Sequence, residues 1–238
     1  MRKLGIIGGT SWNSTALYYD HINRGVARRL GGLHSGRLVI ESLDLAEYVV
    51  FHRSGDLAGG NAMIVDAAKR LKTAGAEGLL LASNTMHKAA EAVAAATKLP
   101  ILDIREAASE RLARDGRRRI ALLGTRYTMT EPFAREPYER HGMVIHELSA
   151  QWRDEVDRII YDELAAGRVV RDSQRKLRTL LTELNKQKVE AVVLGCTELV
   201  LAVDVRANVL PVYDTTAIHS AAAVEWMLGD EELARAAA

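Results

Sequence analysis

The second half of the chain repeats the first half at an offset of about 113 residues. Residues 77–85 align one for one with residues 190–198, and both segments are an acidic residue, then an apolar run, then polar or thiol side chains. Farther on, residues 99–103 match residues 210–214 through a shared Leu-Pro pair. Similarity at a fixed offset is typical of a duplicated structural unit. The sequence therefore predicts two halves of similar fold.

Short apolar runs alternate with longer segments of helical period along the whole chain. Strands are predicted at residues 3–7, 37–42, 78–82, 101–104, 119–123, 144–148, 191–194 and 209–212. Helices are predicted at residues 14–29, 57–74, 86–97, 104–115, 129–141, 152–166, 172–187 and 216–228. This alternation is typical of βαβ units and a parallel sheet. We therefore predict an α/β protein with two flavodoxin-like, parallel-sheet halves related by a pseudo-two-fold axis.

The length of the chain, 238 residues, suits two domains of ordinary size, about 100–150 residues each. The boundary predicted from the repeat places the first half at 1–115 and the second at 116–238. The last helix of the first half, 104–115, could instead pack with the other half. The C-terminal helix, 216–228, could likewise return to the first half.

Charge and composition exclude two classes of partner. The 32 Lys and Arg residues against 31 Asp and Glu give a net charge of +1, without the basic surplus of a nucleic-acid-binding protein. Aromatic residues make up only 5% of the chain, which argues against a base-stacking surface. No apolar run reaches the ~20 residues of a membrane span. We expect neither nucleic acid nor a membrane as a partner.

Cys196 is the only cysteine, so an internal disulfide and a cysteine-based zinc site are excluded. This cysteine usage fits a reducing compartment, and we expect a cytoplasmic protein. Apolar residues in surplus on the predicted helix 14–29 make a homodimer a reasonable expectation.

Polar residues follow four of the predicted strands at their carboxyl ends, where open parallel sheets bind ligands. These groups are Gly8-Gly9-Thr10-Ser11, Ser83-Asn84-Thr85, Thr125-Arg126-Tyr127-Thr128 and Cys196-Thr197-Glu198. Ser83 and Cys196 hold equivalent positions in the repeat, so a pseudo-two-fold axis would bring them face to face across a cleft between the halves. Such a site suits chemistry on two faces of one small molecule.

Four motifs together resemble the aspartate/glutamate racemase family of cofactor-independent amino-acid racemases. They are GIIGGTSW at 5–12, SNTMH at 83–87, LGTRYTM at 123–129 and GCTE at 195–198, and the resemblance runs from Leu4 to about Leu228. The family implies two thiols on opposite faces of the substrate Cα, one removing the α-proton while the other returns a proton. It implies an amino-acid substrate and no cofactor. Cys196 stands in the second thiol position.

Cys196 has the strongest claim to chemistry. A thiol of reference pKa ~8.5 is within reach of function at neutral pH if the N–H groups of a helix N-terminus stabilise its thiolate. The alternative is a buried cysteine that serves only as a small hydrophobic residue. Its neighbours, Gly195 before it and Thr197-Glu198 after it, favour catalysis.

Ser83 stands where the resemblance implies the first cysteine, and a hydroxyl is a much poorer base than a thiolate. Ser83 could relay a proton in a racemase biased toward one enantiomer, or the position could have been altered from cysteine to trap a ligand. The protein could instead do one-sided chemistry, such as the decarboxylation performed by single-cysteine relatives of the racemases. Two non-catalytic alternatives stay open: a helix cap at Ser83, and a catalytically impaired amino-acid-binding protein.

Small polar side chains around these two residues fit a clamp for the substrate α-carboxylate, whose charge grows as the Cα carbanion forms. The predicted substrate-binding residues are Thr10, Ser11, Asn84, Thr85, Thr125, Thr128, Thr197 and Glu198. Glu198 could orient the thiol, receive the substrate ammonium, or only complement a helix dipole. Gly8 and Gly9 could contribute to the clamp or only form a tight turn.

For a substrate side-chain carboxylate, the resemblance implies cations near the end of the second strand and at the start of the mid-chain helix. Arg53, Arg126 and Arg153 could serve, and Arg53 completes the predicted substrate-binding set. The neighbouring acids Asp154 and Glu155 keep a neutral or broader amino-acid substrate open beside aspartate and glutamate. We predict no metal, because no His, Cys, Asp or Glu spacing matches a ligand set, and expect His87 and His219 to be structural hydrogen-bonding residues.

Overall fold

The computed structural model describes residues 1–236, with only the backbone for His52, Arg53 and the residues beyond 229. The chain forms two compact units. Unit 1 is Met1–Asp103 together with the segment from His219 on, and unit 2 is Ile104–Ile218. Each unit contains a four-stranded parallel sheet. The predicted fold class, α/β with two similar parallel-sheet halves, is confirmed.

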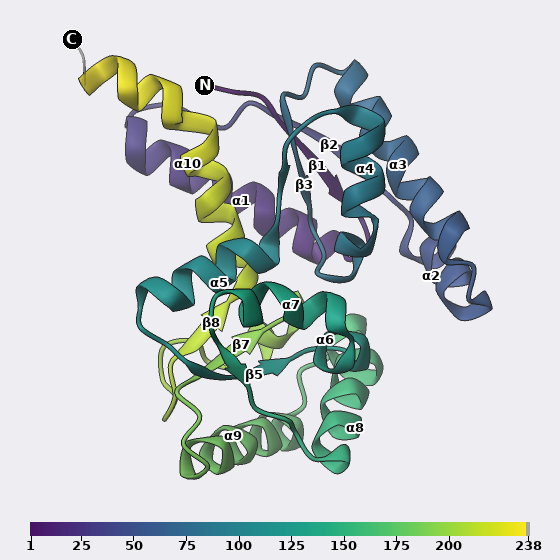
Figure 1. Ribbon diagram of the computed structural model, residues 1–238, viewed down its shortest axis with the longest axis vertical. Helices are drawn as coiled ribbons and strands as arrows, with labels where there is room; N and C mark the ends of the chain where they lie inside the picture. Colours follow the sequence, from purple (N-terminus) through teal and green to yellow (C-terminus); the bar gives the residue numbers. More distant parts are fainter. Residues whose placement is uncertain (237–238) are drawn as a thin grey trace. The chain divides into compact units, whose positions relative to one another are not determined.

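Unit 1 is a three-layer α/β/α arrangement with strand order β2-β1-β3-β4. Its strands are β1 (Leu4–Gly8), β2 (Leu38–Ser42), β3 (Gly78–Leu81) and β4 (Ile101–Leu102). Its helices are α1 (Trp12–Leu30), α2 (Leu45–Ser54), α3 (Leu57–Thr73), η1 (Thr85–Ala89), α4 (Ala90–Thr97) and α10 (Thr215–Ala236). Helices α1 and α10 cover one face of the sheet, and α3 and α4 cover the other (Figure 1).

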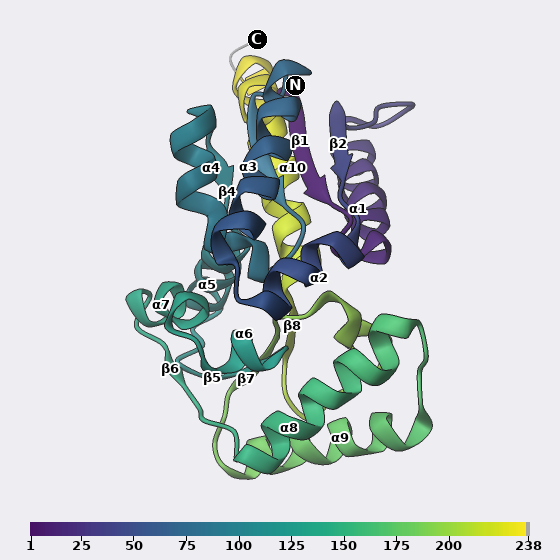
Figure 2. The same ribbon diagram turned by 90° about the vertical axis from the view of Figure 1, so that its right-hand side faces the viewer.

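Unit 2 has the same three layers, with strand order β6-β5-β7-β8. Its strands are β5 (Arg119–Leu123), β6 (Val144–Ile145), β7 (Ala191–Leu194) and β8 (Val212–Asp214). Its helices are α5 (Ile104–Arg114), α6 (Arg126–Thr130), α7 (Pro132–Arg140), α8 (Ala150–Arg158), η2 (Ile159–Glu163), η3 (Leu164–Ala166), α9 (Arg171–Lys186) and η4 (Thr197–Leu201). Helices α8 and α9 cover one face, and α5 and α7 the other (Figure 2).

The two sheets repeat the same hydrogen bonds at equivalent positions. The Leu79 N–H donates to the Pro100 carbonyl at 2.9 Å, and the Val192 N–H donates to the Pro211 carbonyl at the same distance. Both bonds tie the central strand of a sheet to the residue before its outer strand. The sequence repeat is therefore a repeat of backbone geometry.

Two helices follow the last strand of one sequence repeat but pack in the structural unit formed mainly by the other repeat. Helix α5 follows β4 of the first repeat and belongs to unit 2, whereas α10 follows β8 of the second repeat and belongs mostly to unit 1. The compact units therefore divide after Asp103 and after Ile218, while the sequence repeat divides at 115/116.

Several predicted bounds differ from the observed ones for local reasons. The last strand is Val212–Asp214 where 209–212 was expected, because Pro211 has no N–H to donate to a ladder. The expected helix 129–141 is divided by Pro132 into α6 and α7. Helix α2 was not predicted at all. Within the described part of the chain, no helix has both the length and the apolar character needed to cross a membrane.

Candidate active site

The turns after β3 and β7 leave the two sheets with the same hydrogen bond. The Ala82 N–H donates to Ile7 in β1 at 2.9 Å, and the Gly195 N–H donates to Leu123 in β5 at 2.6 Å. The next residues are Ser83 and Cys196. The structure therefore gives this hydroxyl and this thiol the same place at the carboxyl end of a central strand, one in each unit.

The Cys196 thiol is partly buried and hydrogen-bonded to a carboxylate. Its Sγ donates to Glu198 Oε2 at 3.0 Å, and the Thr197 hydroxyl donates to the same oxygen at 2.8 Å. This hydrogen bond is compatible with a role for Glu198 in orienting the thiol.

The surroundings of Cys196 favour the protonated thiol. Burial raises the pKa of Cys196 well above its usual range, and the negative charges of Glu198 and Asp157 add to the increase. A hydrogen bond from the Glu198 backbone N–H opposes them without reversing the result. The expected stabilisation of a thiolate by a helix N-terminus is thus outweighed, because the five-residue η4 places a carboxylate against the sulfur. These surroundings therefore favour the neutral thiol over the thiolate.

Close packing explains the glycines of the third and fourth motifs, Gly124 and Gly195. A Cβ on Gly195 would lie 2.7 Å from Thr128 Cγ2 and 3.2 Å from the Leu123 carbonyl oxygen. A Cβ on Gly124 would lie 2.9 Å from Thr128. Thr128 is buried and its hydroxyl lies 3.4 Å from that of Thr125. The two strand ends can approach Thr128 this closely because neither carries a side chain.

In unit 1, the Ser83 hydroxyl lies 3.0 Å from the Thr85 hydroxyl, so the two form a hydrogen bond. The Ser83 carbonyl accepts a hydrogen bond from Nδ1 of the buried His87 at 2.9 Å. Asn84, between them, is also buried. The His87 bond anchors the turn that carries the hydroxyl, which agrees with the structural role expected for this histidine.

The turn after β1 is fixed by its glycine pair and by a helix cap. Gly9 has a φ of +86°, and a Cβ there would lie 2.0 Å from the Leu43 carbonyl oxygen, so only glycine fits. The Ser11 side chain caps α1 by accepting from the Ser14 N–H at 3.4 Å. The hydroxyl of Thr10 is buried and has no hydrogen-bond partner among the described residues. Thr10 therefore keeps an unused donor at this strand end.

His219 is a fully buried structural residue, as predicted. Its Nε2 donates to the Leu102 carbonyl at 2.9 Å and its Nδ1 accepts from the Tyr18 hydroxyl at 2.9 Å. Burial, with a smaller contribution from His87, lowers the pKa of His219 to about 3. The ring is therefore neutral at physiological pH, and both nitrogens are committed.

Two residues near the thiol escaped the sequence analysis, Asp157 and Tyr161. Asp157 accepts a hydrogen bond from the Arg126 N–H at 2.7 Å. Partial burial, and then the negative charge of Asp157, raises the pKa of Tyr161 to about 12, with contributions from Cys196 and Glu198. Tyr161 lies on the π-helical turn η2, a geometry often found at functional sites. In the sequence, these two residues are four apart on the predicted helix 152–166, a spacing that places both on one face of a helix.

The acidic pair of α8, Asp154 and Glu155, is bound by cations of α6, α8 and α9. Asp154 binds Arg126 at 2.7 Å, and Glu155 binds Arg158 at 2.9 Å and Lys176 at 2.8 Å. These contacts neutralise the acidic pair that weighed against an acidic substrate.

The structure does not test the predicted role of Arg53 in substrate binding. The side chain of Arg53 lies outside the described residues. Across those residues, no three His, Cys, Asp or Glu side chains gather as metal ligands would.

These features define the class: a two-unit α/β protein with a thiol and a hydroxyl at equivalent strand ends. Residues 7–223 match the family model described as Asp/Glu/Hydantoin racemase, and the chain belongs to this family. The family membership expected from the four motifs is confirmed.

Solved structures with the same fold include three racemase-like proteins. A candidate Asp/Glu racemase from Yersinia pestis is 41% identical with a TM-score of 0.90, over 96% of this chain and 100% of that chain. An aspartate racemase homologue from Pyrococcus horikoshii OT3 is 32% identical with a TM-score of 0.82, over 95% and 99%. An aspartate racemase from Picrophilus torridus, 18% identical with a TM-score of 0.75 over 96% and 95%, shares the fold.

Proposed function

We propose that this protein is a cofactor-independent amino-acid racemase, with aspartate and glutamate as the leading substrates. The observation that carries the proposal is the thiol–carboxylate pair Cys196–Glu198 at the strand end equivalent to that of Ser83. The family and the two relatives above 30% identity support an acidic amino acid as the substrate. The proposal requires that Cys196 and Ser83 reach opposite faces of one substrate Cα.

Cys196 and Glu198 act together on one face of the substrate. Transfer of the Sγ proton to Glu198 Oε2 gives a thiolate, which removes the α-proton as a general base. The electron pair left on Cα delocalises into the α-carboxylate, where hydroxyl and N–H donors stabilise the added charge. Because the resting thiol is protonated, the substrate ammonium assists this step by lowering the thiol pKa. Asp157, Tyr161 and the unused Thr10 hydroxyl extend the set of groups available to bind substrate.

Ser83 returns a proton from the opposite face. Its hydroxyl is hydrogen-bonded to Thr85, through which it can recover a proton from solvent. A hydroxyl is a much weaker acid–base group than a thiol, so protonation on this face is the slow step. The two enantiomers have equal free energy in solution, so kcat/KM must be equal in both directions. The difference in acid–base strength between Cys196 and Ser83 therefore appears as exchange of the α-proton on the Cys196 face without inversion of the substrate.

The deciding experiment incubates the protein with single enantiomers of aspartate, glutamate and neutral amino acids in deuterated water. One enantiomer should exchange its α-proton faster than it racemises, and Cys196→Ala should abolish both processes. Ser83→Ala should lower racemisation more than exchange, and Ser83→Cys should bring the two rates together. Binding without exchange for every amino acid would favour an amino-acid-binding protein. Racemisation by Ser83→Ala at the parental rate would leave Ser83 as a structural residue.

A second candidate function is decarboxylation of a disubstituted malonate. The observation that favours it is the protonated Cys196 thiol, which can protonate a carbanion left by loss of carbon dioxide. Such a reaction needs one proton donor and no partner on the opposite face. Release of carbon dioxide from a malonate, with amino acids left unchanged, would support this function over the racemase.

A further inference from the structure

One acidic side chain of α8, Asp157, has no counter-charge among the described residues. The helix carries three acids, and the other two bind cations: Asp154 binds Arg126 at 2.7 Å, and Glu155 binds Arg158 at 2.9 Å. Asp157 is also partly buried. A carboxylate taken out of water without a cation is costly. Asp157 therefore leaves a place in unit 2 for a positive charge that the described residues do not supply.

Asp157 is held at the carboxyl end of β5, beside the strand that carries the thiol. Its Oδ1 accepts the Arg126 N–H at 2.7 Å, three residues after β5 ends at Leu123. The Gly195 N–H, directly before Cys196, donates to the Leu123 carbonyl at 2.6 Å. The negative charge of Asp157 accordingly contributes to the raised pKa of the Cys196 thiol. Carboxylate and thiol thus belong to the same strand-end region of unit 2.

Two carboxylates in this region each keep one oxygen open. Asp157 uses Oδ1 for the Arg126 N–H, and Glu198 uses Oε2 for the Cys196 thiol and the Thr197 hydroxyl. The other oxygen of each accepts no hydrogen bond from the described residues. In the proposed reaction Glu198 takes up the thiol proton, so Asp157 is the carboxylate that keeps its charge throughout. A primary ammonium, with three N–H donors and a positive charge, matches that open oxygen.

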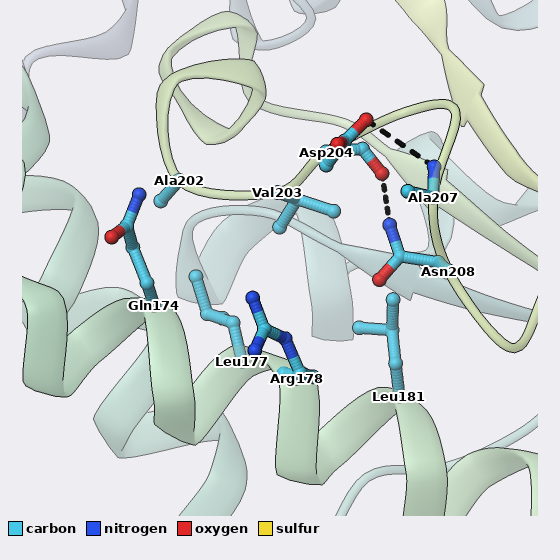
Figure 3. Close-up of a pocket in the computed structure, with 9 residues that line it drawn as sticks. All are labelled: Gln174, Leu177, Arg178, Leu181, Ala202, Val203, Asp204, Ala207 and Asn208. Atoms are coloured by element: carbon cyan, nitrogen blue, oxygen red, sulfur yellow. Dashed lines mark hydrogen bonds between the residues drawn. The ribbon is translucent and has the colours of Figure 1, made fainter.

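The acid in the loop that follows η4 differs from Asp157 in its surroundings. Asp204 Oδ1 accepts hydrogen bonds from the N–H groups of Arg206 at 2.8 Å and Ala207 at 3.3 Å, the second of which is drawn in Figure 3. The Asp204 side chain is exposed, so solvent can hydrate its remaining oxygen. Asp204 therefore needs no bound cation, whereas the partly buried Asp157 gains one when an amino acid binds.

We propose that Asp157 binds the α-ammonium group of the substrate and makes the site select amino acids over the corresponding hydroxy acids. This assignment rests on the racemase function proposed above, in which the same substrate places its Cα beside Cys196. An ammonium at Asp157 also cancels a negative charge that opposes the thiolate. Binding of an amino acid therefore favours transfer of the Cys196 proton to Glu198, whereas a hydroxy acid brings no positive charge to this region.

The test measures binding by isothermal titration calorimetry for three matched pairs: aspartate and malate, glutamate and 2-hydroxyglutarate, and alanine and lactate. Each hydroxy acid carries a hydroxyl where its partner carries the ammonium. Asp157→Asn keeps an oxygen for the Arg126 N–H and removes the charge. For the amino acid that the parent binds best, this variant should lower the preference over the hydroxy acid at least tenfold. Asp154→Asn makes the same change on the same helix and should keep the parental preference.

The hydroxy acids separate recognition of the ammonium from a general loss of structure. Asp157→Asn should bind them at least as well as the parent does, because it removes a negative charge near an anionic ligand; circular dichroism verifies folding. An unchanged preference in this variant, or an equal loss for both members of a pair, would overturn the assignment of Asp157 alone. A parent protein that binds none of the three amino acids would overturn the racemase proposal and this assignment together.

Discussion

The carboxylate of Glu198 should control the reactivity of the Cys196 thiol. Replacing Glu198 with glutamine removes the negative charge 3.0 Å from Sγ and keeps the size and polarity of the side chain. The thiol pKa should fall, because the thiolate no longer meets a neighbouring anion. Cys196 is the only cysteine in the chain, so alkylation of the whole protein reports on this one group.

The size of the effect follows from the distance. Two unit charges 3.0 Å apart interact by about 1.4 kcal/mol in water and about 5.5 kcal/mol at an effective dielectric constant of 20. At about 1.4 kcal/mol per pKa unit, even the lower value predicts a fall of about one unit. Thiolate nucleophilicity decreases as the pKa falls, so the net gain below both pKa values is about threefold per unit.

The assay measures the rate of iodoacetamide alkylation by mass spectrometry between about pH 7 and 9, with circular dichroism to verify folding. Glu198→Gln should react about threefold faster than the parent or more. Glu139→Gln makes the same charge change on an exposed residue of unit 2 and should react at the parental rate. If Glu198→Gln reacts no faster, Glu198 does not hold the thiol protonated and the proposed proton transfer to it fails.

Three further predictions concern packing and pH-dependent stability. Gly195→Ala should destabilise the protein by about 1–3 kcal/mol, since its Cβ would lie 2.7 Å from Thr128 Cγ2; adding Thr128→Ser, which lacks that methyl, should recover part of the loss in thermal unfolding. Hydrogen bonds from Arg158 and Lys176 lower the pKa of Glu155 to about 2. The stability that Glu155 contributes is therefore complete above about pH 4.5 and is lost as the pH falls toward 2. Glu155→Gln should therefore cost about 1–2 kcal/mol at pH 7, after allowance for partly exposed partners, and nothing near pH 2 in urea unfolding. Between about pH 6.5 and 3, the unfolded chain binds a proton at His219 that the folded chain excludes. The free energy of unfolding should therefore decrease as the pH falls through this range. His219→Gln should reduce the slope of unfolding free energy against pH by up to about 1.4 kcal/mol per pH unit.

Strand positions were predictable because each strand is a continuous apolar run between charged or turn residues. The predicted 119–123 and 191–194 agree with the observed β5 and β7 residue for residue. Such runs are typical of strands buried on both faces, and these strands are almost wholly buried. The strand-end polar residues followed from the same pattern, which located Ser83, Cys196 and their neighbours.

The parts that escaped prediction depend on contacts distant in sequence or on subtle backbone changes. The expected helix 152–166 contains the π turn η2, and a helical period cannot reveal a change from i→i+4 to i→i+5 bonding. The protonation of Cys196 depends on burial and on the direction of the Glu198 side chain. Neither the burial of Cys196 nor the direction of the Glu198 side chain can be derived from the sequence of the helix N-terminus alone.

The exchange of α5 and α10 between the units has a consequence for biosynthesis. Val224, Met227 and Leu228 of α10 belong to the apolar cluster beneath one face of the first sheet. These three residues are synthesised after the whole of unit 2. The part of that face that α10 covers therefore stays exposed while the ribosome makes the intervening residues, with only α1 packed on it. Exposed apolar surface on a nascent domain favours aggregation or chaperone binding. A chain cut at the repeat boundary, or stopped before His219, would leave the N-terminal sheet in the same unprotected condition permanently.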